Sequence, residues 1–139
     1  MSLELLLRLA GASLIFLSLF HAVLWRSLGW SREIALLSPL SRRVFAVHTF
    51  FIAFVLLALG LLSSLQPELL LSRSELARQL LSGIVLFWVA RFLMQPLVFD
   101  AAMRSGWTRH LPLRVGVCLV WLTYVAVYAA ALARQWGRL

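Results

Sequence analysis

The sequence predicts an all-α protein, an up-down antiparallel four-helix transmembrane bundle. Two observations support this prediction: the chain is 63% hydrophobic and only 13% charged, and its apolar residues fall into four long runs. A soluble domain is about half apolar and about one-quarter charged, so this chain has too few charges to cover a water-facing surface. At this length we predict one transmembrane domain covering residues 1–139.

The four runs are each long enough to cross a bilayer, because about 20 apolar residues span about 30 Å of hydrocarbon in a helix. The expected helices cover about residues 5–25, 44–65, 80–99 and 111–132. Backbone polar groups in lipid must be satisfied within the segment, which favours helices. The short connections predict that successive helices are antiparallel neighbours.

Two connections are expected to carry short helices of their own. Ser31–Ser38 is expected to form a helix that ends at Pro39, and Pro67 suits the first turn of another. The spacing of Ser72 and Glu75 is that of a capping box, so the third long helix is expected to begin just after Ser72.

The basic residues are all arginines, and they indicate how the chain is oriented. The first and third connections hold seven arginines, and the opposite side of the predicted bundle holds five. Cytoplasmic loops are enriched in Arg and Lys, so we predict a cell inner membrane protein with both termini outside the cytoplasm. The absence of Lys and Asn is typical of a GC-rich bacterial genome. The net charge of +8 lies mainly beside apolar runs, so we expect lipid and no nucleic acid as a partner.

Several catalytic signatures are missing from the sequence. It contains no Gly-rich phosphate loop, no His-Glu-x-x-His, no Cys-x-x-Cys and no paired carboxylates, which disfavours hydrolase and kinase chemistry. The lone cysteine, Cys118, lies in an apolar run, where cysteine is usually a small hydrophobic residue. Whether the chain is an enzyme stays open.

A polar layer is predicted at one end of the four runs. His21, His48 and Gln95 each lie about four residues from that end, and Arg91 lies one turn deeper. On the fourth run Cys118 lies at a similar level, with Trp121 and Tyr124 one and two turns deeper. Trp121, Tyr124 and Tyr128 form an aromatic stripe at helical spacing, which is more often part of a core.

On the third run, Trp88, Arg91 and Gln95 have the i, i+3, i+7 spacing of one helix face. An arginine within a span costs about 2.5–3.5 kcal/mol, and no acidic residue lies in the four runs to neutralise it. Arg91 therefore either faces a ligand, or extends to the headgroups while Gln95 bonds a neighbouring helix. Pro96 removes a backbone donor, so the Phe92 carbonyl is expected to lose its partner.

The two histidines allow several interpretations. They could ligate a b-type haem, with Arg91 near a propionate or a quinone oxygen, or share a metal site completed by Gln95 or water. Otherwise they form hydrogen bonds between helices, or are interfacial histidines at the ends of their spans. Ser18 is expected to bond His21 or a preceding carbonyl, and the small residues around Gly11 predict close helix approach.

The order of these features resembles that of uncharacterised bacterial four-helix integral membrane proteins. The similarity covers most of the chain and rests on Trp30 with Arg32-Glu33, on Ser38-Pro39-Leu40-Ser41-Arg42-Arg43, and on Phe87-Trp88-x-x-Arg91-x-x-x-Gln95. The resemblance implies one site for Arg91 and Gln95 and no particular activity.

We therefore predict a small polytopic membrane protein whose polar inner-leaflet pocket binds a quinone, haem or lipid-like ligand, as a subunit of a redox complex. The predicted binding residues are His21, His48, Trp88, Arg91, Gln95 and Tyr124. His21 and His48 are also the candidate metal ligands. The alternatives are an accessory subunit without a ligand, and an enzyme acting on a lipid or prenyl substrate with a histidine base. A membrane protein partner or a second copy of the chain is expected beside the lipid bilayer.

Overall fold

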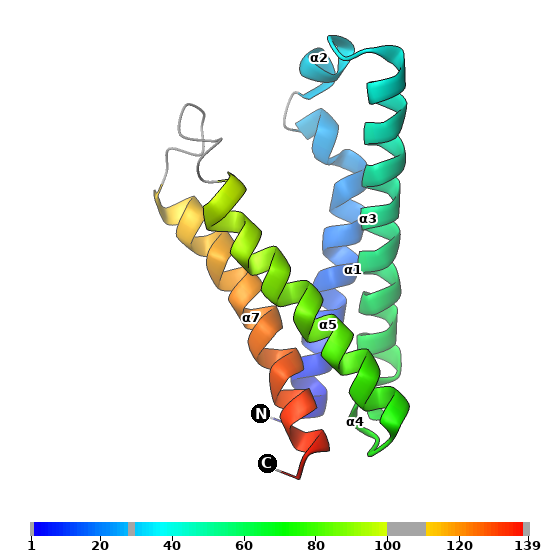
Figure 1. Ribbon diagram of the computed structural model, residues 1–139, viewed down its shortest axis with the longest axis vertical. Helices are drawn as coiled ribbons and strands as arrows, with labels where there is room; N and C mark the ends of the chain where they lie inside the picture. Colours follow the sequence, from blue (N-terminus) through cyan, green and yellow to red (C-terminus); the bar gives the residue numbers. More distant parts are fainter. Residues whose placement is uncertain (1, 28–29, 100–110, 138–139) are drawn as a thin grey trace. The chain divides into compact units, whose positions relative to one another are not determined.

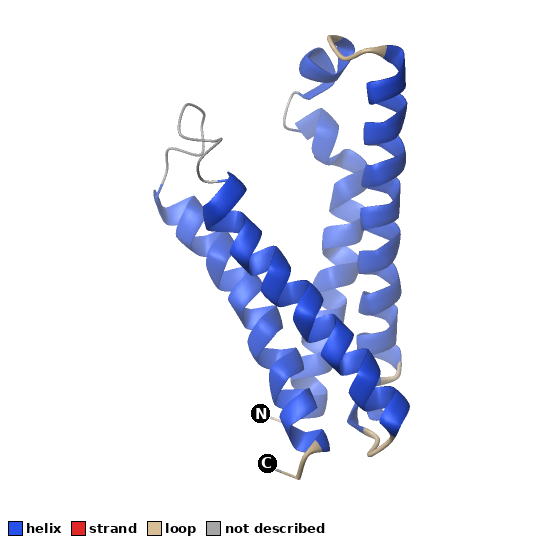
Figure 2. Cartoon of the chain, in the orientation of Figure 1, coloured by secondary structure: helices blue, strands red, loops and turns tan. Residues whose placement is uncertain are grey.

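The computed structural model describes residues 2–27, 30–99 and 111–137, and these are helical almost throughout (Figures 1 and 2). No strand occurs in these ranges. The elements in chain order are α1 (Leu3–Ser27), α2 (Trp30–Ala35), α3 (Pro39–Leu65), α4 (Pro67–Leu71), α5 (Glu75–Met94), the π-helix η1 (Gln95–Phe99) and α7 (Leu111–Gln135). The predicted fold class, an all-α four-helix transmembrane bundle, is confirmed.

Four helical segments are long and apolar enough to cross a membrane. They are Leu3–His21, Pro39–Leu65, Glu75–Leu97 and Val115–Gln135. Each matches one of the four runs expected from the sequence, and each exceeds the roughly 18 residues that a span requires. The chain is thus a multi-pass membrane protein.

The helix starts differ from two of the expectations. Pro39 does not end the preceding short helix, which stops at Ala35, but begins α3 behind an N-cap. The hydroxyl of that cap, Ser38, accepts the Ser41 N–H at 3.2 Å. Proline is favoured at this position because the first N–H groups of a helix have no intrahelical partner. The helix therefore starts five residues before residue 44.

The cap of α5 is Ser74 and not Ser72. The Ser74 hydroxyl accepts the Ala77 N–H at 3.1 Å, and the helix begins at Glu75. The Ser72 hydroxyl instead donates to the Leu69 carbonyl at 2.7 Å, at the end of α4. Both serines suit a cap, and the turn geometry after α4 decides between them.

The chain divides into two compact units, Leu7–Pro67 and Met1–Leu6 with Glu68–Leu139. We call them the α1–α3 unit and the α5–α7 unit and describe each by itself. The single domain over residues 1–139 stays a prediction.

Antiparallel packing of α1 and α3 builds the first unit. Arg8 Nη1 donates to the Ser64 carbonyl at 2.7 Å, and the Ser18 hydroxyl donates to the Ala53 carbonyl at 2.7 Å. Between these bonds the backbones approach at Gly11 and Gly60, where an added Cβ at Gly11 would lie 2.6 Å from the Gly60 carbonyl oxygen. The close approach predicted around Gly11 is confirmed, whereas Ser18 bonds the opposite helix and not His21.

Antiparallel packing of α5 and α7 builds the second unit. The Arg78 guanidinium lies 5.0 Å from the centre of the Trp136 ring near the start of α5. Further along α5, the Trp88 ring stacks on Tyr124. The Gln135 amide also donates to the Leu70 carbonyl at 2.8 Å, which joins the end of α7 to α4. This pairing brings the predicted face of α5 against α7.

Candidate functional site

The predicted polar face of α5 is turned inward. The Trp88 side chain is 1% exposed and Gln95 is 4% exposed, while Arg91 between them is partly buried. The helical spacing of the three residues explains this common direction, because positions i, i+3 and i+7 lie along one stripe of an α-helix. Arg91 is therefore not simply extended toward lipid headgroups.

Gln95 is the centre of a hydrogen-bond group that joins α5 to α7. Its Oε1 accepts hydrogen bonds from both terminal nitrogens of Arg91 at 3.3 Å. The same atom accepts a hydrogen bond from the Trp121 indole N–H at 3.4 Å. The Arg91 guanidinium also lies 4.4 Å from the centre of the Trp121 ring. A cation over an indole face is stabilised by the ring quadrupole, and most strongly where water is excluded. These contacts stabilise the Arg91 charge within a span whose acidic residue, Glu75, lies at the opposite end.

Three aromatic rings extend the group deeper into the unit. Trp88 stacks on Tyr124 with ring centres 4.5 Å apart, and on Trp121 with centres 5.7 Å apart. Tyr124 is 4% exposed. We name Trp88, Arg91, Gln95, Trp121 and Tyr124 the α5–α7 cluster.

The Trp88 indole N–H is an unusual feature of this cluster. It is buried and has no hydrogen-bond partner among the residues that the structure describes. Buried indole N–H groups normally find an acceptor, because a donor left unpaired away from water costs about 1–3 kcal/mol. Each such group in a native protein requires an explanation, and an acceptor supplied by a ligand is one of them.

The end of α5 corrects one expectation. The Phe92 carbonyl is not left without a donor, because the Gln95 N–H bonds to it. Beyond Gln95 the chain continues as η1, which contains Pro96. A π-turn of this kind accommodates a proline by shifting the hydrogen-bond pattern, and π-turns are frequent at functional sites. Two polar residues that follow η1 in the sequence, Asp100 and His110 in the third connection, lie outside the described residues.

The two predicted histidines lie in the α1–α3 unit. The Nδ1 atom of His21 is 2.7 Å from the Leu17 carbonyl oxygen of its own helix, so Nδ1 carries the hydrogen and donates. The bonds from Arg8 to Ser64 and from Ser18 to Ala53 set the register of the two helices, which places His21 opposite about residue 50. His48 therefore lies at a similar level along the helix axes.

The environment of His48 differs from the predicted site. Its side chain is exposed and lines an open groove of about 430 Å³ with Leu37, Leu40, Ser41, Val44 and Phe45. Within the described ranges no group of three or more His, Cys, Asp or Glu side chains is arranged to hold a metal ion. Metal or haem ligation by His21 and His48 stays a prediction.

The six predicted residues thus fall into two sets. Trp88, Arg91, Gln95 and Tyr124 come together in the α5–α7 unit, and His21 and His48 belong to the α1–α3 unit. Trp121 was expected only as part of the aromatic stripe, and its contacts with Arg91 and Gln95 were not predicted. Its i−3 spacing from Tyr124 was the available signal.

The fold and the cluster define a class, the multi-pass helical membrane proteins with a buried polar and aromatic group in a span. Comparison with known proteins gives no closer assignment. No family model, no curated protein and no solved structure matches the chain.

Proposed function

We propose that this chain is a membrane binding protein whose α5–α7 cluster holds a lipid-soluble ligand by an acceptor oxygen, either a quinone or a lipid-like molecule. The observation that carries the proposal is the buried Trp88 N–H, which has no acceptor among the described residues. In the hydrocarbon region no bulk water is present to accept this hydrogen bond. An oxygen atom of a ligand would satisfy it.

The chemistry around Trp88 specifies the ligand further. The indole N–H is a donor, and the neighbouring Arg91 is a delocalised cation with donors only. Both select a ligand with carbonyl, phosphate or carboxylate oxygens. The rings of Trp121 and Tyr124 add flat apolar surfaces, which favour a planar head group such as a quinone.

An accessory role without a ligand is the second candidate, and it is supported by Gln95. Gln95 Oε1 already accepts from Arg91 and from Trp121, so this part of the cluster joins two helices without needing a ligand. Interhelical hydrogen bonds in membranes contribute about 0.6 kcal/mol on average. In that case the unpaired Trp88 N–H lowers the stability of the fold without serving a ligand.

Replacement of Trp88 by Phe separates the two candidates, because Phe keeps an aromatic ring and removes the N–H. The probe is decyl-ubiquinone, titrated into the detergent-purified protein, together with mass spectrometry of the lipids that copurify. Loss of a hydrogen bond worth about 0.5–1.5 kcal/mol weakens binding about 2- to 12-fold. Trp136→Phe is the matched control, since the Trp136 side chain is exposed.

The thermal stability of the same variants completes the test. For a ligand site, Trp88→Phe reduces quinone or lipid retention and leaves the unliganded fold intact. For a structural subunit, wild-type protein retains nothing specific, and Trp88→Phe is more stable because an unpaired buried donor has been removed. Equal retention by wild type and Trp88→Phe refutes the binding proposal.

A haem and a role in a redox complex form a separate part of the proposal, supported by His21. Donation from Nδ1 to a backbone carbonyl leaves Nε2 as the free acceptor, which is the arrangement of many metal-bound histidines. Absorption spectra of oxidised and dithionite-reduced protein test it. A Soret band that disappears in His21→Ala supports a haem, and a featureless spectrum excludes one while leaving a colourless ligand at Trp88.

The proposal includes a location in a bacterial inner membrane with both termini outside the cytoplasm. The arginine distribution between the two sides supports it. Labelling of single cysteines placed at Ser2 and at Ser38 in a Cys118→Ser background tests the orientation in intact cells. Labelling of the Ser38 position alone by an impermeant reagent contradicts it.

A further inference from the structure

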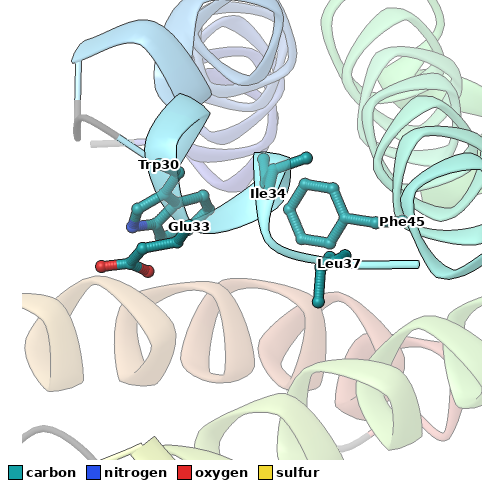
Figure 3. Close-up of a pocket in the computed structure, with 5 residues that line it drawn as sticks. All are labelled: Trp30, Glu33, Ile34, Leu37 and Phe45. Atoms are coloured by element: carbon teal, nitrogen blue, oxygen red, sulfur yellow. The ribbon is translucent and has the colours of Figure 1, made fainter. Parts of the chain in front are cut away.

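The α1–α3 unit carries an open apolar groove where the chain turns from α2 into α3. One part is a hollow of about 260 Å³, with Trp30, Glu33, Ile34, Leu37 and Phe45 around it (Figure 3). The groove next to it shares Leu37 and Phe45 and continues along α3 to His48. We name residues 30–48 the α2–α3 corner. Its lining is mostly aliphatic and aromatic and belongs to neither helix alone.

The corner is held in shape by its own contacts. Arg42 Nη2 donates to the Ala35 carbonyl at 2.9 Å and to the Leu37 carbonyl at 3.4 Å, at the end of α2. The Trp30 and Phe45 rings meet edge to face with centres 6.3 Å apart. Because carbonyls at a helix end lack intrahelical partners, a guanidinium there stabilises the turn. The groove is therefore a built part of the fold.

The charged side chains of the α2–α3 corner are mainly positive, and the one that lines the groove is Glu33. Arg32 and Arg43 are exposed and have no hydrogen bond or ion pair with any described residue, whereas Arg42 is used in the turn. Glu33 is the single acidic residue in the corner, against three arginines. Two arginines of the corner, neither of which lines the groove, are thus available for an anionic group.

The position of the corner along α3 selects the kind of ligand. The apolar segment of α3 starts at Val44, and the arginines immediately precede it. Basic residues at the end of a span lie at the level of the lipid headgroups, and tryptophan is enriched there. A molecule in this place has an acyl chain beside the span and a headgroup beside the arginines.

From the groove and the charge around it, we infer that the α2–α3 corner binds one acidic phospholipid. Its phosphate pairs with Arg43 and Arg32, and an acyl chain lies against Leu37, Leu40 and Val44. Juxtamembrane arginines attract anionic lipid with about 1 kcal/mol each, or about a fivefold change in affinity. This site shares no residue with the α5–α7 cluster.

The experiment measures binding of phosphatidylglycerol and of phosphatidylcholine to the full chain by native mass spectrometry from detergent. Wild-type protein is expected to retain phosphatidylglycerol in preference to phosphatidylcholine. Arg43→Gln is expected to bind phosphatidylglycerol about fivefold more weakly. Arg73→Gln is the matched control, because Arg73 is likewise exposed and has no hydrogen bond or ion pair with a described residue, but lies between α4 and α5.

A second pair of variants tests the groove without changing the charge. Val44→Trp fills the groove and is expected to reduce phosphatidylglycerol binding, and Val47→Trp, exposed on the same helix outside the lining, is expected to leave it unchanged. Circular dichroism during heating confirms that the variants fold. Equal loss in Arg43→Gln and Arg73→Gln would overturn the inference in favour of general charge attraction, as would equal retention of the two lipids by wild type.

Discussion

The closest helix approach in the α1–α3 unit makes Gly11 a sensitive position. A Cβ atom added there would lie 2.6 Å from the Gly60 carbonyl oxygen and 2.6 Å from the Ser64 nitrogen. Ordinary contacts of a Cβ begin at about 3.4 Å, so α1 and α3 would have to separate by about 0.8 Å. We predict that Gly11→Ala destabilises the protein although alanine is the better helix former.

The expected magnitude follows from two opposing effects. Forcing an extra methyl group into packed structure costs about 1–3 kcal/mol. Replacing glycine by alanine within a helix returns about 1 kcal/mol. At Gly83, where an added Cβ meets nothing within 4 Å, only the second effect operates. The free energies of unfolding of Gly11→Ala and Gly83→Ala should therefore differ by about 1–3 kcal/mol.

The assay is reversible unfolding in mixed detergent, followed by circular dichroism at the helix band. Gly11→Ala should unfold earlier than wild type, and Gly83→Ala at the same point or later. Gly60→Ala should behave like Gly11→Ala, because its added Cβ would lie 2.8 Å from Ile15 Cγ1. Equal stability of Gly11→Ala and Gly83→Ala would refute the close approach of the two backbones.

Two further variants test hydrogen bonds that the structure assigns. Ser18→Ala removes a bond to the Ala53 carbonyl of the opposite helix and should cost about 0.6 kcal/mol, up to about 1.7, in the same unfolding assay; Thr123→Ala, whose hydroxyl bonds Leu119 in its own helix, should cost less. Arg42→Gln should speed amide hydrogen exchange in α2 about fivefold, as expected for loss of about 1 kcal/mol of hydrogen bonding, and unchanged exchange would refute the turn described here.

Helix type and number followed from the sequence because they depend on local properties. Twenty consecutive apolar residues require a helix in lipid whatever they pack against. The i, i+3, i+7 spacing likewise placed Trp88, Arg91 and Gln95 on one face before any partner was known. Helix starts were less predictable, since Ser72 and Ser74 both suit a cap and Pro39 suits either side of a boundary.

Contacts between helices could not be read from the sequence in the same way. Ser18 bonds Ala53, and the partner of Gly11 is Gly60, because the rotation of each helix about its axis sets which side chains meet. Successive residues differ by 100° around the axis, so a small rotation exchanges one partner for another. The depth of a residue along a span does not determine how its helix is rotated, and therefore does not determine its partner.

By itself, therefore, the sequence determined a multi-pass all-helical membrane protein with an arginine and a glutamine on one face of its third span. Only the tertiary structure decided that Trp121 on α7 completes this group, that the Trp88 N–H has no acceptor in the described part of the chain, and that His48 lines a groove. The physical reason is that apolar length and periodicity act within one segment, whereas hydrogen bonding and ring stacking depend on how two segments are rotated against each other.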